Sequence, residues 1–96
     1  MKIIYSTRAR NDLLVIGDYL LSNNFDLNII RQIRDKIKIL KERPNFGSIY
    51  QGKARKILIL KKNVVYYQIN QDTIEILHIS AGRQKKGLQN DASAKW

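Results

Sequence analysis

Three short apolar runs follow one another in KILILKKNVVYYQINQDTIEILHIS, the stretch at residues 56–80. The runs at 56–60, 64–69 and 73–80 are rich in β-branched and aromatic residues, as strands commonly are. Three polar residues separate each run from the next, which is enough for a tight hairpin turn. The stretch therefore predicts three consecutive strands joined as an antiparallel meander.

Two amphipathic helices are expected before this meander. Ser6 is suited to cap the first helix, whose apolar residues recur every three or four positions: Ala9, Leu13, Ile16 and Leu20. The second helix begins near Asp26 and ends just before Pro44, with the apolar residues Ile30, Ile33, Ile37 and Leu40 on one face. Because only a few residues join the helices, we expect them to be antiparallel neighbours.

A short apolar segment at residues 2–5 predicts one further strand at the N-terminus. The order is then strand, two-helix hairpin and three-stranded antiparallel meander. This order indicates an α+β fold with both helices on one face of the sheet and part of the other face uncovered. Since 96 residues are too few for two separate cores, we expect one domain over residues 1–84 and a polar tail at 85–96.

The composition restricts the possible functions. The chain has 18 Lys and Arg against 8 Asp and Glu, a formal net charge of +10. A nucleic acid, an acidic protein or an anionic membrane surface would relieve the resulting self-repulsion, and a solvated basic surface is the alternative. With no cysteine and one histidine, we expect no disulfide, no metal and no cofactor. No apolar run is long enough to span a membrane or to act as a secretory signal, which predicts a cytoplasmic protein.

The positive charge is concentrated in the second half of the chain. Neither segment 43–71 nor segment 76–90 contains an Asp or a Glu. The residues that we predict to bind a partner lie in these segments: Lys53, Arg55, Lys56, Arg83, Lys85 and Lys86. Direct nucleic-acid binding through 53–56 and Lys61–Lys62 is a separate possibility, but along the sequence no aromatic residues are interleaved with these cations.

Two further patterns have a structural and a functional interpretation. His78, the only histidine, should share a strand face with Ile74 and Ile76, and we interpret it as a packed strand residue rather than a catalytic one. Cations repeat along the second helix as a stripe, which we interpret as a solvated face that could also belong to a partner surface: Arg31, Arg34, Lys38 and Lys41.

The order and spacing of these pieces resemble the RelE/ParE superfamily of small bacterial toxins, closer to ParE. The resemblance covers roughly residues 3–84 and rests on a set of short matches: Ile4-Tyr5-Ser6, Ala9, Asp12-Leu13, Ile16, Tyr19, Leu40, Pro44, Gly47, Arg55, Val65 to Ile69, Ile74 to Ile79, and Gly82-Arg83-Gln84. It implies the toxin of a type II toxin–antitoxin pair, which a cognate acidic antitoxin holds inactive.

The resemblance leaves two modes of action. ParE-like toxins inhibit DNA gyrase, whereas RelE-like toxins cut mRNA on the ribosome. Arg55 and Arg83 match catalytic arginines of the ribonucleases. The ribonucleases also typically carry a Tyr or His just after the last strand, and many relatives have a histidine at the position of residue 81. Here residue 81 is an alanine and residues 84–88 contain no Tyr or His. The long helical hairpin also favours ParE. We therefore expect a ParE-like gyrase inhibitor without catalytic residues. A RelE-like mRNA endonuclease is the alternative, and a toxin-like chain that has kept only binding is a third possibility.

Overall fold

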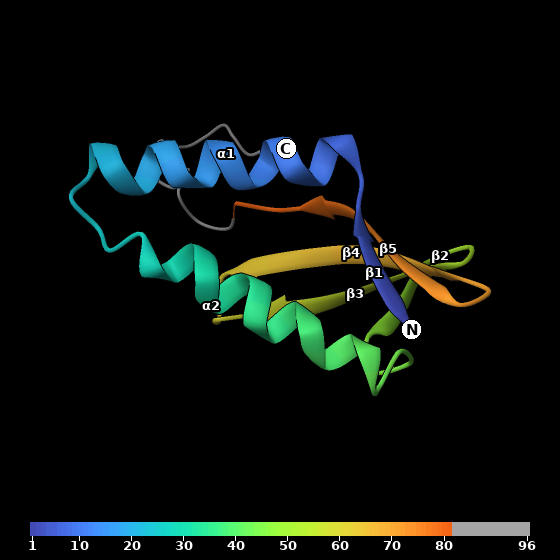
Figure 1. Ribbon diagram of the computed structural model, residues 1–96. Coiled ribbons are helices and arrows are strands. Elements are labelled where there is room, and N and C mark those ends of the chain that lie inside the picture. Colours follow the sequence, from blue (N-terminus) through green and yellow to red (C-terminus); the bar gives the residue numbers. More distant parts are fainter. Residues whose placement is uncertain (82–96) are drawn as a thin grey trace.

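The computed structural model describes residues 1–81 (Figure 1). The predicted tail at 85–96, and with it Arg83, Lys85 and Lys86, lies outside these described residues. The elements follow in the order β1 (Lys2–Tyr5), α1 (Thr7–Ser22), α2 (Asn28–Ile37), the short 3-10 helix η1 (Lys38–Lys41), β2 (Ser48–Gln51), β3 (Ala54–Ile59), β4 (Asn63–Asn70) and β5 (Thr73–Ile79).

The strands form one sheet in the order β1-β5-β4-β3-β2. Strands β2 to β5 make an antiparallel meander, and β1 pairs in parallel with β5. The expected α+β architecture is confirmed, but the meander has four strands rather than three. The strand that was not predicted from the sequence is β2, a four-residue edge strand with every residue exposed. It lacks the apolar alternation that reveals a half-buried strand.

Both helices cover the same face of the sheet, with α1 running beside β5 (Figure 1). The helices bury seven of the eight apolar residues that their periodicity predicted, which are Ala9, Leu13, Ile16, Leu20, Ile33, Ile37 and Leu40. The eighth, Ile30, is only partly buried and packs against the edge of this core. The facing side chains of the sheet are Ile59, Val65, Tyr67, Ile74, Ile76 and Ile79. In contrast Leu58, which points to the opposite face, is 64% exposed, so part of that face is open within the described residues.

The core also holds the loop that connects η1 with β2. The hydroxyl of the fully buried Tyr67 donates to the carbonyl of Pro44 at 2.7 Å and accepts from the amide of Gly47 at 2.9 Å. A Cβ on Gly47 would lie 2.8 Å from this hydroxyl and 2.8 Å from the carbonyl oxygen of Lys56. Glycine is therefore required here because the loop passes so close to β3 and β4.

Helix α1 is fixed to the sheet at its first residues. The Ser6 hydroxyl accepts from the amide of Ala9 as the predicted N-cap and donates to the carbonyl of Leu77, both at 3.0 Å. The Ser6 amide donates to the carbonyl of Ile76 at 3.0 Å. Because β1 ends at Tyr5, the Ser6 amide and hydroxyl supply the next hydrogen bonds to the edge of β5 beyond β1.

Candidate partner-binding surfaces

The predicted cationic residues of β3 do not form one cluster. Arg55 and Lys56 are neighbours in a strand, so their side chains point to opposite faces. Arg55 pairs with Tyr67 on the helix side, where its Nη1 donates to the carbonyl of Gly47 at 2.8 Å. Lys56 pairs with Tyr66 on the open side and is exposed, as is Lys53 in the turn before β3. The side chain of Arg55 thus supports the loop at Gly47. That Arg55 and Lys56 face opposite sides follows from strand alternation and was already predictable from the sequence.

The open face of the sheet carries a row of aromatic and cationic side chains. The rings of Tyr50 and Tyr66 meet edge to face with centroids 4.9 Å apart, and the ring of Tyr66 stacks on that of His78 at 5.4 Å. The ammonium of Lys56 lies 5.5 Å from the centroid of Tyr50. Aromatic side chains beside a cation are common at the centres of protein interfaces. The row was not visible in the sequence because its members come from four different strands.

His78 is packed, as expected, but on the other face from the one predicted. Tyr66 pairs with His78 while Tyr67 pairs with Ile76, which leaves Leu77 as an extra residue in β5. This β-bulge reverses the alternation, so the prediction that His78 shares a face with Ile74 and Ile76 is wrong. Bulges of this kind depend on the pairing of two strands and leave no mark in the apolar pattern of one.

Asp12 of α1 joins His78 at the edge of the sheet. Its Oδ2 lies 2.7 Å from Nδ1 of His78 and accepts from the amide of Ile79 at 2.8 Å. The two side chains are only 20% and 22% exposed. Strand β1 pairs with β5 only as far as Ile76, so it offers no acceptor to the Ile79 amide. The Asp12 carboxylate accepts from this amide instead and thereby anchors α1 to β5. Sequence reasoning missed this role, because Asp12 and His78 are 66 positions apart.

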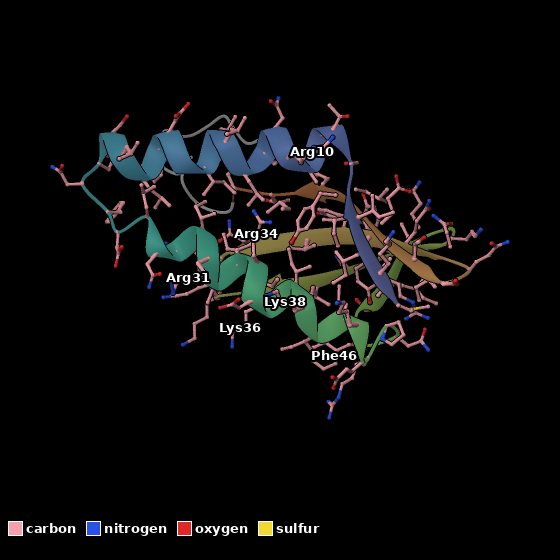
Figure 2. The ribbon with its side chains drawn as sticks, viewed as in Figure 1. Arg10, Arg31, Arg34, Lys36, Lys38 and Phe46 are labelled. Atoms are coloured by element: carbon pink, nitrogen blue, oxygen red, sulfur yellow. The ribbon has the colours of Figure 1, made fainter. Side chains whose placement is uncertain are left out.

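The helix side presents the cationic stripe, of which Figure 2 labels Arg31, Arg34 and Lys38, and an apolar groove. Along α2 and η1 the cations Arg31, Arg34, Lys36, Lys38 and Lys41 are all exposed. Between α1 and α2 lies an open groove of about 590 Å³, which has Arg10, Arg34 and Asp18 in its walls. Its lining is otherwise apolar and includes Leu13, Leu14, Leu21, Leu27 and Ile30.

Arg34 is the one cation of the stripe with an aromatic support. Its guanidinium lies 5.5 Å from the ring centroid of Tyr5. Burial raises the pKa of the Tyr5 hydroxyl above its usual 10.0, and the positive charge of Arg34 opposes this rise. The ring thus holds the guanidinium near the surface of α2, where it remains exposed.

Neither a metal centre nor a membrane span is found in residues 1–81. This part of the chain has no group of three or more His, Asp or Glu side chains that could hold a metal ion. In the same range, no helix is both long and apolar enough to cross a bilayer.

Comparisons with known proteins agree with this fold. Residues 3–86 match the family described as the ParE toxin of the type II toxin–antitoxin system parDE. The structure is similar to one titled as the chromosomal ParDE TA system from P. aeruginosa, with a TM-score of 0.75 and 20% identity, covering 83% of this chain and 94% of that chain. It is also similar to the solution structure of the conserved hypothetical protein HP0894 from Helicobacter pylori, with a TM-score of 0.51 and 21% identity, covering 83% and 92%.

The curated proteins contain no match to this sequence. The two solved structures show the fold alone, because both are less than 25% identical to this chain. The family match carries more weight, since it extends over nearly the whole length of the domain. This chain therefore belongs to the ParE toxin family of type II toxin–antitoxin systems.

Proposed function

We propose that the chain is a toxin that inhibits DNA gyrase through protein–protein contact, and that a cognate acidic antitoxin neutralises it in the cytoplasm. The observation that carries this proposal is the family match over residues 3–86. A sheet face with aromatic and cationic side chains and a net charge of +10 also favour acidic protein partners. In this mode the chain needs no catalytic residue and no cofactor.

The gyrase-contacting residues proposed are Arg83, Lys85 and Lys86, the first three cations after the last strand. A gyrase supercoiling assay with the purified full chain should show lost supercoiling or trapped cleaved DNA. The variant Arg83→Gln/Lys85→Gln/Lys86→Gln should lose this effect. A control that also loses three charges, Lys2→Gln/Lys61→Gln/Lys62→Gln, should retain it. Gyrase that stays fully active over a wide dose range of the wild-type chain would discard the proposal.

The antitoxin is proposed to cover the open sheet face. There Tyr50, Tyr66 and the exposed Leu58 supply an apolar centre, and Lys56 supplies positive charge beside Tyr50. Lys53, exposed in the turn before β3, is proposed to add a second charge. An extended acidic segment would pair with these lysines and shield the apolar residues from water. The test is co-expression with the adjacent gene, which the proposal expects to encode a short acidic protein; Lys53→Glu/Lys56→Glu should weaken the co-purification of that protein. Undiminished co-purification of this charge-reversed variant would argue for another surface.

The alternative, a RelE-like endonuclease that cuts mRNA on the ribosome, has less support. One of its two expected arginines, Arg55, uses its guanidinium to hold the loop at Gly47. It also lies on the opposite face from Lys56, so these two cations cannot share one phosphate. Primer extension on mRNA from a translation extract distinguishes the modes, because codon-phased cuts that disappear in Arg83→Ala would establish the endonuclease.

A further inference from the structure

The cationic stripe of α2 and η1 differs from the other basic parts of the described chain in its continuity. Residues 27–43 contain six Lys and Arg and only two acidic residues, Asp35 and Glu42. The clusters at 53–56 and 61–62 are shorter, and the first of them is divided between the two faces of the sheet. Among residues 1–81, only the stripe therefore offers a line of exposed cations along one helix.

The spacing of the stripe has a definite geometry. Arg31, Arg34, Lys38 and Lys41 are separated by three, four and three residues, which places them along one side of the helix. With a rise of about 1.5 Å per residue, and slightly more in η1, the line extends over about 16 Å. One strand of duplex DNA has a phosphate every 3.4 Å or so along its axis. The four side chains can therefore follow the phosphates of one strand.

These cations are free to bind an anion. In the described part of the chain, a single Lys or Arg forms an ion pair, which joins Lys38 Nζ to Asp35 at 3.8 Å between exposed side chains. Such a surface pair contributes little and is readily exchanged for a stronger anion. Figure 2 shows Arg31 and Lys36 on α2, Lys38 at the start of η1, and Arg34 on the side of α2 that faces α1. Arg34 is oriented by the ring of Tyr5 at 5.5 Å.

The chemistry of the stripe distinguishes a phosphate backbone from an acidic protein. A protein interface normally needs buried apolar or aromatic anchors among its charges. The four residues of the stripe are all cations, and the nearest apolar channel lies to one side, where only Arg34 borders it. A phosphate backbone needs no apolar anchor, because the release of its condensed counterions supplies the binding free energy.

We infer that the stripe Arg31–Arg34–Lys38–Lys41 is a binding site for the phosphate backbone of double-stranded DNA. The site is independent of the proposed contact with gyrase and adds a second macromolecule that the toxin can hold. Binding by phosphate contacts alone is independent of base sequence and strongly dependent on salt. The expected dissociation constant is of the order of 10⁻⁴ to 10⁻⁶ M at physiological salt, as for other sequence-independent binders.

The test measures fluorescence anisotropy of a labelled 20-base-pair duplex with the full chain, without gyrase, between 50 and 200 mM salt. About four phosphate contacts predict a slope near −4 for the logarithm of the association constant against that of the salt concentration. Arg31→Gln/Arg34→Gln/Lys38→Gln should weaken binding at 50 mM salt at least about tenfold and reduce the slope by about 2 to 3. The control Lys2→Gln/Lys61→Gln/Lys62→Gln removes the same charge from other surfaces, including the Lys61–Lys62 pair that the sequence offered as a separate nucleic-acid site. It should stay within about threefold of wild type, and a loss as large as that of the stripe variant would overturn the inference.

A second stripe variant guards against a folding artefact. Arg31→Gln/Lys38→Gln/Lys41→Gln leaves the contact between Arg34 and Tyr5 in place, and it should weaken binding to a similar degree while keeping the wild-type circular dichroism spectrum. Equal losses in the stripe variants and in the control would show a mere effect of net charge and overturn the inference. So would an absence of binding at 50 mM salt, or displacement of the DNA by polyglutamate at an equal concentration of negative charge.

Discussion

Asp12 shows how one side chain can replace a strand. Its carboxylate accepts from the amide of Ile79 at 2.8 Å and lies 2.7 Å from the imidazole of His78. A buried amide without a partner is destabilising by about 1–3 kcal/mol, so an edge that β1 does not reach needs a substitute acceptor. This arrangement gives the only histidine a structural role and leaves no reason to assign it chemistry.

Asp12→Ala should lower the free energy of unfolding by about 1–3 kcal/mol, because the Ile79 amide and the His78 ring both lose their partner. Urea denaturation measures this loss, and faster hydrogen exchange at the Ile79 amide locates it. Asp18→Ala on the same helix is the control, since Asp18 is exposed and should change stability by less than about 0.5 kcal/mol. Equal effects of the two substitutions would contradict the edge-anchoring role of Asp12.

At the scale of elements, the loop between η1 and β2 is held by contacts from β3 and β4. Tyr67 contributes its hydroxyl to both sides of the loop, and Arg55 donates to the carbonyl of Gly47 at 2.8 Å. These bonds position β2 as an edge strand although its own residues are all exposed. The geometry of this loop therefore depends on neighbouring strands more than on its own sequence.

Two glycine-to-alanine substitutions should have opposite effects on stability. Gly47→Ala places a Cβ 2.8 Å from the Lys56 carbonyl, so the loop must move, and we expect a loss of about 1–3 kcal/mol. Gly17→Ala lies within α1 with nothing within 4 Å of the new Cβ, and we expect a gain of about 0.5–1 kcal/mol. Thermal unfolding of the two variants checks both signs. A Gly47→Ala protein as stable as wild type would show that the loop is not confined.

At the scale of the whole molecule, the helices leave the second face of the sheet open in residues 1–81. Leu58 is 64% exposed on this face, beside the aromatic row formed by Tyr50, Tyr66 and His78. An apolar face of this kind favours association, whereas the net charge of +10 opposes contact between two copies. Salt decides between these tendencies, because the Debye length falls to about 8 Å at 0.15 M ionic strength.

We therefore expect the isolated chain to self-associate through the open face and to do so more strongly as salt is raised. Leu58→Gln should reduce this association, as measured by sedimentation velocity between 0.05 and 0.5 M salt. Leu14→Gln is the matched control, because Leu14 is 68% exposed but lies on the helix side. A monodisperse wild-type monomer at millimolar concentration would count against self-association through the open face.

The sequence by itself determined the types of most elements and the buried residues of the helices. Helical and strand periods are local properties, so Ala9, Leu13, Ile16 and Leu20 identified the buried face of α1 before any contact was known. The same local pattern predicted Ser6 as the N-cap, which its bond with the Ala9 amide confirms. The resemblance to RelE/ParE toxins, also read from the sequence, agrees with the family match.

Only the tertiary structure decided what pairs across the sheet. The extra residue Leu77 moves His78 to the open face, the carboxylate of Asp12 reaches the edge of β5, and β2 forms although it has no apolar pattern. The physical reason is that strand register and edge contacts depend on segments far apart in the chain. A one-dimensional pattern records which residues avoid water, but it does not record which neighbour each of them meets.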